Sequence, residues 1–158
     1  MPSVPKIKPV RVHGAKTESA ATSLLLKLNS EFRAPTASQK KKLLIAFARK
    51  NKVLYGRAYD VIRISGPEPI NLDDEEDIKK NFDRITIYEI KSTTRKLDKA
   101  FKGYFFALTT AELLVAQNLK EKYRFIFVNI NTEHTLEQSL QEVMNRATGL
   151  YPQWSISF

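Results

Sequence analysis

The sequence has 158 residues, of which 42% are apolar and 10% aromatic, and this composition predicts a folded domain with a sizeable core rather than a disordered chain. It contains no cysteine, which excludes disulfides, thiolate zinc sites and cysteine nucleophiles. The net charge of +9 is uneven, since residues 1–52 hold 12 Lys and Arg against 2 Asp and Glu, whereas residues 53–158 hold 14 against 15.

The basic front of the chain favours a polyanionic partner, because Lys and Arg that neutralise phosphates release counterions and so provide affinity for nucleic acid. Solubility alone is the alternative explanation of the charge. An anionic membrane surface fits less well, since the basic segments carry no strongly apolar anchoring face. The sequence has no long uncharged apolar run, and residues 1–6 lack the apolar segment of a secretory signal. We therefore expect a soluble cytoplasmic protein without a membrane partner.

In chain order, the sequence predicts a basic arm followed by helices, strands and loops. Residues 1–15 are typical of a flexible arm, because prolines lie among lysines and an arginine, and residues 16–158 are expected to form a single domain. The predicted elements are a helix over 17–29, a helix over 38–50, strands over 53–56 and 58–64, a long solvated loop over 65–84, a strand over 85–91, a short strand over 104–108, a helix over about 109–121, a strand over 123–130, a helix over about 135–146 and an edge strand over 154–158.

Capping residues mark the predicted starts of three of these helices. Thr17 is the predicted cap of the first helix. Thr109 and Glu112 have the spacing of a capping box, in which each side chain bonds the backbone of the other. Thr135 and Gln138 have the same spacing at the start of the last helix.

The strand over residues 85–91 carries two charges among core residues. Alternate residues of a strand point the same way, so Glu89 and Lys91 share a face with Ile85 and Ile87. A buried charge is costly and persists only when it is paired with another charge, with hydrogen bonds or with a metal. Glu89 and Lys91 are therefore candidate site residues, and solvated charges on an exposed edge strand are the alternative interpretation.

Asp60 is a third candidate, because it shares a face with the apolar residues of the preceding strand. If the two strands pair antiparallel with Ile64 opposite Ile85, Asp60 lies across from Glu89, with Lys91 one step further along the same face. The long loop between the strands does not fix this register. The alternative is that Asp60 accepts a hydrogen bond from a nearby backbone amide at the start of its strand.

These residue types favour a divalent cation. Two neighbouring carboxylates repel each other, and oxygen ligands without sulfur favour Mg²⁺, with Mn²⁺ as a substitute. We expect Asp60, Glu89 and the carbonyl of Ile90 to hold the ion, which would lower the pKa of a bound water and neutralise a phosphate under attack. Lys91 would orient that water or stabilise the transition state. Hydrolysis of a phosphodiester, with Asp60, Glu89 and Lys91 as catalytic residues, is the predicted chemistry.

At this point the chain resembles the PD-(D/E)XK nuclease superfamily, whose signature is an Asp on one strand and Glu-x-Lys on the next. Asp60 matches the first part, although Tyr59 stands where the motif has proline, and Glu89-Ile90-Lys91 matches the second. Over about residues 53–130 the chain is similar to the carboxy-terminal domain of the plant NO VEIN protein and related restriction-type nucleases. The residues that carry this narrower resemblance are Tyr88 to Thr93, Phe105 to Thr109, Glu112, Ala116 and Tyr123 to Phe125.

The resemblance implies an α/β fold with a restriction endonuclease-like core, in which a mixed central β-sheet is flanked by α-helices. It also implies an accessory acid on the first helix, where Glu18 is the candidate. The expected function is a Mg²⁺-dependent endonuclease that cleaves double-stranded DNA, most simply of the restriction type. A chain of this size would need two copies to cut both strands, so a homodimer is expected.

The basic residues outside the motif are expected to hold the phosphate backbone. They lie on the second helix and on the connection after the Glu-x-Lys strand, and they are Lys40, Lys41, Lys42, Arg95, Lys96, Lys99 and Lys102. A non-catalytic nucleic-acid-binding module of the same fold and a junction-resolving or repair nuclease are the alternatives. RNA binding is disfavoured, because the aromatic residues fall mainly at core-like strand positions.

Overall fold

The computed structural model of the protein describes residues 14–152, and its centre is a five-stranded mixed sheet in the order β1-β2-β3-β4-β5. β3 and β4 run parallel, and every other neighbouring pair of strands is antiparallel. The elements are α1 Gly14–Leu28, β1 Phe32–Arg33, α2 Ala37–Ala48, β2 Val61–Ile64, α3 Glu75–Lys80, β3 Ile85–Thr93, α4 Thr110–Leu119, β4 Tyr123–Asn129, β5 Thr135–Gln138 and α5 Leu140–Arg146, with short 3-10 helices η1 Phe82–Arg84 and η2 Lys120–Lys122. The expectation of an α/β protein with a mixed sheet between helices is confirmed at this level.

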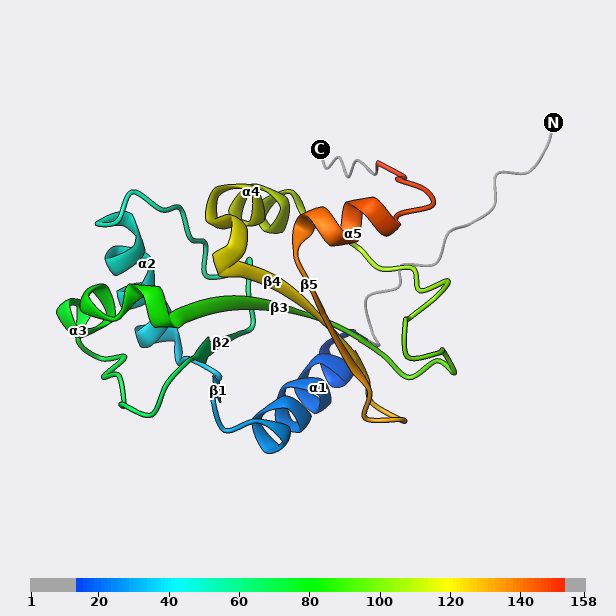
Figure 1. Ribbon diagram of the computed structural model, residues 1–158, viewed down its shortest axis with the longest axis horizontal. Coiled ribbons are helices and arrows are strands. Elements are labelled where there is room, and N and C mark those ends of the chain that lie inside the picture. The colour runs from blue at the N-terminus through cyan, green and yellow to red at the C-terminus, as the bar shows by residue number, and fades with distance from the viewer. Residues whose placement is uncertain (1–13, 153–158) are drawn as a thin grey trace, which may run out of the picture.

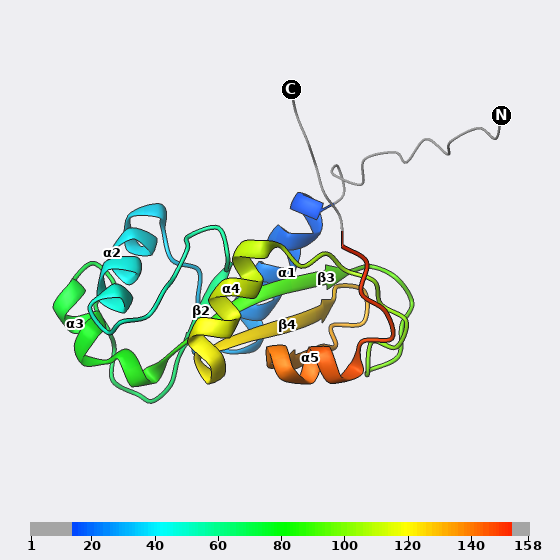
Figure 2. The ribbon, with the colours of Figure 1, turned by 90° about the horizontal axis from the view of Figure 1, so that it is seen from above.

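The alternation of side chains in β3 builds a core on each face of the sheet. Ile85 and Ile87 join the larger core, to which α2 contributes Phe47 and α4 contributes Val115. Tyr88 and Ile90 point the other way and join a smaller core with Ala21 and Leu25 of α1. In Figure 1, α1 accordingly lies on one side of the sheet and α4 and α5 lie on the other. Figure 2 shows α2 and α3 at the end of the sheet where β3 begins.

The predicted register between β2 and β3 is confirmed. Ile64 lies opposite Ile85, and the pairing continues to Val61 opposite Tyr88. Asp60 directly precedes β2, and its backbone N–H donates at 2.9 Å to the carbonyl of Tyr88, the residue that Val61 already faces. The regular pairing therefore ends at Val61, and the prediction that Asp60 lies directly across from Glu89 is wrong, because two residues face one at this point.

The capping predictions have mixed outcomes. The box of Thr109 and Glu112 is present at the start of α4, with both reciprocal bonds formed. Thr17 is not a cap, because α1 begins at Gly14 and includes the last two residues of the predicted arm. The rest of that arm, residues 1–13, lies outside the described residues, as does the predicted edge strand over 154–158.

The segment over residues 65–84 is not a plain loop, since it contains α3 and η1. The side chain of Asp74 caps α3 by accepting from the backbone N–H of Glu76. Acidic residues in the first turn of a helix also interact favourably with its positive end. Ile78 of α3 and Phe82 of η1 are buried in the larger core. Their burial stabilises these helices, although the acidic residues 73–77 had favoured a solvated loop.

Residues 53–56 and 104–108, both predicted as strands, pair with no strand in the described part of the chain. Phe106 instead packs its ring against Phe127 at 5.1 Å between centroids, so its segment lies across the sheet rather than beside it. Residues 135–138 form β5 rather than the start of a helix. The capping box there consists of Ser139 and Glu142, which begin α5.

Candidate active site

Asp60 lies at the start of β2 with its carboxylate beside the backbone of β3. Its Oδ2 accepts a hydrogen bond from the N–H of Ile90 at 2.8 Å. The carboxylate therefore occupies the place of a strand partner, which is the amide-bonding role considered for Asp60 from the sequence. The N–H and C=O of one strand residue point toward the same neighbour, so the carbonyl of Ile90 also faces the side on which Asp60 lies.

Glu89, Lys91 and Glu112 form a buried group of charges on the α4 side of the sheet. Lys91 Nζ lies 3.0 Å from Glu89 Oε1 and 2.7 Å from Glu112 Oε2, and the three side chains are 10%, 10% and 6% exposed, with Glu112 the most buried. Two carboxylates thus share one ammonium. The interpretation of Glu89 and Lys91 as solvated charges on an exposed edge strand is wrong, because both side chains are buried and paired.

Glu112 reaches Lys91 because of how α4 begins. As part of the capping box, its Oε2 also accepts from the backbone N–H of Thr109 at 3.1 Å, which turns the side chain back toward the helix start. The sequence identified Glu112 as a capping residue and as part of the resemblance, but not as a partner of Lys91. The available signal was that a buried lysine needs compensating charge, although spacing alone does not show which acid supplies it.

Burial above all, and then the charges of Asp60 and Glu112, raise the pKa of Glu89 to about 9 against the opposing effect of Lys91. Burial alone would lower the pKa of Lys91, but Glu89 and Glu112 more than offset this, and the net shift is upward. Lys91 therefore stays charged. Three acids facing one lysine leave this region short of positive charge, and Glu89 compensates by holding a proton near neutral pH.

Glu18 of α1 reaches the same place from the other face of the sheet. Burial raises its pKa, and so does Asp60, with which Glu18 shares a side-chain hydrogen bond, whereas Lys40 acts in the opposite direction. Asp60 thus contacts Glu18 of α1 through its side chain and the backbone of β3 through its carboxylate. The candidate accessory acid is thus next to the first acid of the motif.

The donor set suits a hard divalent cation, since Glu18, Asp60, Glu89 and the carbonyl of Ile90 all offer oxygen. Among residues 17–152, however, no group of three or more Asp, Glu or His side chains is close enough together to hold an ion as it stands. Glu89 is turned to Lys91.

The basic residues predicted to contact DNA are in different situations. Lys40 Nζ donates to the carbonyls of Gly56 at 3.1 Å and Tyr59 at 2.8 Å, so it anchors the chain just before Asp60. Lys42 pairs with Glu75 of α3 at 3.7 Å. The remaining members of the set are exposed and make no ion pair with any described residue: Lys41, Arg95, Lys96, Lys99 and Lys102.

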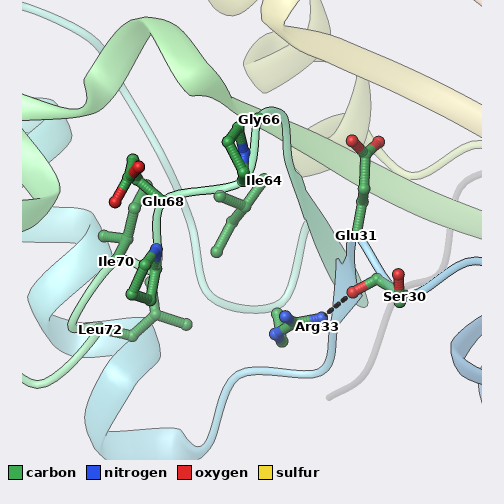
Figure 3. Close-up of a pocket in the computed structure, with 10 residues that line it drawn as sticks. Ser30, Glu31, Arg33, Ile64, Gly66, Glu68, Ile70 and Leu72 are labelled. Carbon is green, nitrogen blue, oxygen red and sulfur yellow. Dashed lines mark hydrogen bonds between the residues drawn. The ribbon is translucent and has the colours of Figure 1, made fainter.

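A pocket of about 320 Å³ lies away from these residues, where β1 and β2 meet the segment before α3. Figure 3 shows Arg33 and Ser30 on one side of it and Glu68 and Ile70 on the other. None of the predicted site residues lines it. The candidate active site is accordingly not this cavity but the junction of α1, β2, β3 and α4.

Comparisons with protein-family models, with curated proteins and with solved structures found no match to this chain. The described residues include no helix that is both long and apolar enough to cross a membrane. The function is therefore argued from the side chains at the junction, since a fold by itself does not define an activity.

Proposed function

We propose that this protein is a Mg²⁺-dependent endonuclease that hydrolyses phosphodiester bonds in DNA, with a PD-(D/E)XK-type site on a restriction endonuclease-like core. The observation that carries the proposal is the bond from the N–H of Ile90 to the carboxylate of Asp60. It fixes Asp60 against the strand that bears Glu89 and Lys91. This contact supports the proposal, because the motif requires its first acid beside the strand of Glu-x-Lys.

Asp60, Glu89 and the carbonyl of Ile90 would hold the Mg²⁺ ion, with Glu18 supporting Asp60. The bound ion would supply an activated water and would neutralise charge on the attacked phosphate. The raised pKa of Glu89 supports this role, because a carboxyl that holds a proton for lack of positive charge can exchange that proton for a cation.

Lys91 would orient the attacking water and stabilise charge on the phosphate. It stays protonated between its two carboxylates, and its contact with Glu112 would hold it in place if Glu89 served as a ligand of the ion. Glu112 is therefore a positioning residue, since it holds the ammonium of Lys91 without contacting the substrate itself.

A plasmid-nicking assay tests the proposal. Supercoiled plasmid with Mg²⁺ is incubated with the wild-type protein, with Glu89→Gln and with Lys91→Met, and EDTA serves as the metal-free control. We expect each substitution to reduce the rate at least about 100-fold. Glu76→Gln is the matched control, because Glu76 is an exposed acid on α3, at the end of the sheet where β3 begins, and it contacts none of the site residues. Nicking that persists in Glu89→Gln would remove the proposed site.

A non-catalytic nucleic-acid-binding module is the second candidate. It is favoured by one observation: within residues 17–152, no three acidic or histidine side chains lie close enough to one another to hold an ion. In that case the charges of Glu89, Lys91 and Glu112 would serve only to connect β3 with α4. Plasmid binding that needs no Mg²⁺ and is followed by no nicking would support this candidate.

The biological type of cleavage is a finer part of the proposal. We take restriction-type cutting by a homodimer as the first choice and junction resolution or repair as the competing choice. Parallel digestion of linear duplex and of a four-way junction separates them, because a resolving enzyme cuts only the branched substrate. Sedimentation with and without DNA gives the number of copies in the active complex.

A further inference from the structure

Two exposed aromatic side chains, from segments far apart in the sequence, lie together on the surface. Phe105, between β3 and α4, is 73% exposed, and Tyr151, after α5, is 76% exposed. Their ring centroids are 6.3 Å apart with an angle of 50° between the planes. Residues far apart in the sequence thus form one aromatic surface, which is not explained as core packing.

The backbone around Phe105 explains why this ring faces outward. Tyr104 and Phe106, on either side of it, both pack against the ring of Phe127, at 6.1 Å and 5.1 Å between centroids. The hydroxyl of Tyr104 also donates to the carbonyl of Ser92 at 2.6 Å. Two inward anchors therefore hold Phe105 outward on a segment tied to β3 one residue beyond Lys91.

The same connection from β3 to α4 carries an exposed set of cations, namely Arg95, Lys96, Lys99 and Lys102. Its beginning is held in place, because the side-chain amide of Asn129 donates to the carbonyl of Arg95 at 2.9 Å and that of Asn131 to the carbonyl of Thr94 at 2.7 Å. Figures 1 and 2 show this connection extending beyond the far end of β3. One connection thus carries both cations and an exposed aromatic ring, which is the combination by which proteins bind single-stranded nucleic acid.

We propose that Phe105 and Tyr151 stack on an unpaired base, so that this protein prefers DNA with a single-stranded segment next to the phosphodiester at the site. The cations of the connection would contact the phosphates of the strand, while the ring of Phe105 stacks on a base that is not paired with a second strand. In a duplex the bases are already stacked and paired, so the aromatic surface adds affinity only for unpaired DNA. The substrate preference rests on the proposed nuclease function, but the binding of single strands does not.

Fluorescence anisotropy with a labelled single strand and with the duplex of the same sequence measures this binding. Phe105→Leu keeps the apolar surface and removes the aromatic face, so we expect the affinity for the single strand to fall about tenfold and the affinity for the duplex to stay unchanged. Phe105→Trp should retain or increase single-strand affinity. Tyr55→Leu is the matched control, because Tyr55 is 47% exposed and makes no ring contact with a described residue.

A second measurement places the base on the ring. A strand that contains 2-aminopurine is titrated with protein, and its fluorescence should be quenched by wild type and Phe105→Trp but much less by Phe105→Leu. Thermal unfolding of each variant shows whether a change in binding follows from lost folding. Because Phe105 is exposed, we expect the melting temperatures to agree closely.

Several outcomes would overturn the proposal. They are unchanged single-strand affinity in Phe105→Leu, equal loss for duplex and single strand, and a dimer of the DNA-free protein that dissociates in Phe105→Leu, which would make the patch a contact between two copies. The two proposals fail separately. Phe105-dependent binding without nicking would refute only the nuclease, whereas Mg²⁺-dependent nicking with Phe105-independent binding would refute only the stacking surface. Stronger quenching of 2-aminopurine in a single-stranded RNA than in the DNA strand of the same sequence would overturn the preference for DNA.

Discussion

Glu89 is the residue whose environment departs most from that of an ordinary surface acid. Burial raises its pKa from 4.5 to about 9. Between these values the folded protein binds a proton that the unfolded chain has released, so the free energy of unfolding falls as the pH rises. Below the usual pKa both states are protonated, and above the raised value the loss is complete. The group thus destabilises the fold at neutral pH in the absence of a cation.

Glu89→Gln should therefore stabilise the metal-free protein. Glutamine resembles the protonated carboxyl and has no charge to desolvate, so we expect a gain on the order of 1–3 kcal/mol at about pH 8 and a smaller one at about pH 6. Urea unfolding in EDTA at the two pH values measures it. Equal pH dependence in wild type and variant would show that Glu89 does not carry the raised pKa.

Mg²⁺ should reverse this destabilisation in the wild-type protein. Binding requires the ionised form of Glu89, so the ion displaces a proton and its apparent affinity should rise about tenfold per pH unit below the raised pKa. Isothermal titration calorimetry in two buffers of different ionisation enthalpy measures both the affinity and the proton released. An affinity independent of pH, or no heat of binding, would contradict the role of Glu89 as a ligand.

At the scale of elements, the start of α4 joins helix capping to the proposed chemistry. Glu112→Gln keeps a side chain that can complete the capping box with Thr109 but removes the negative charge beside Lys91. We expect the free energy of unfolding to change by less than about 1 kcal/mol while kcat of nicking falls about 10- to 100-fold with little change in KM.

The box at the start of α5 provides the control for this substitution. Glu142 makes the same bonds with Ser139, at 2.6 Å to the backbone N–H, but lies outside the candidate site. Glu142→Gln should leave the kinetic constants of nicking unchanged. Equal loss of activity in the two variants would mean that capping, and not the charge beside Lys91, supports the reaction.

The elements that local chemistry defines were predictable. β3 and β4 are dense in β-branched and aromatic residues, and the box of Thr109 and Glu112 has a fixed spacing, so both kinds of feature were recognised. The register of β2 on β3, with Ile64 opposite Ile85, was assumed from the faces that the two strands bury, and the structure confirms it as far as Val61 opposite Tyr88. The predictions failed where tertiary contacts determine the structure. In α3, for example, the acidic residues predicted a solvated loop, whereas the burial of Ile78 stabilises a helix.

The candidate site was predictable in its residues but not in its pairing. Strand periodicity placed Glu89 and Lys91 on one face of β3, and the pairing of β2 with β3 brought Asp60 to the same strand, where its carboxylate accepts from the N–H of Ile90. The contact of Lys91 with Glu112 depends on how α4 packs on the sheet, and no spacing in the sequence encodes that packing. The turning of Glu89 toward Lys91 likewise depends on the local balance of charge.

For the whole molecule, part of the positive charge that the sequence carries in residues 1–52 is neutralised by acidic residues from later in the chain. On α2, Lys42 pairs with Glu75, and Arg49 pairs with both Glu75 and Glu76. The exposed cations without such partners among residues 17–152 include those of the connection after β3. The end of the molecule that carries this connection is therefore the better candidate for contact with the phosphate backbone.

Salt dependence distinguishes the two ends. Replacing Arg95, Lys96, Lys99 and Lys102 by glutamine should reduce the slope of log affinity against log salt, by about 0.9 for each lost phosphate contact with duplex DNA. Replacing Lys41, Lys42 and Arg49 on α2 should reduce it less, because two of these three are already paired with acids. Duplex binding measured by anisotropy over a range of salt concentrations gives both slopes. A larger change from the α2 variant would place the contact surface at the other end of the sheet.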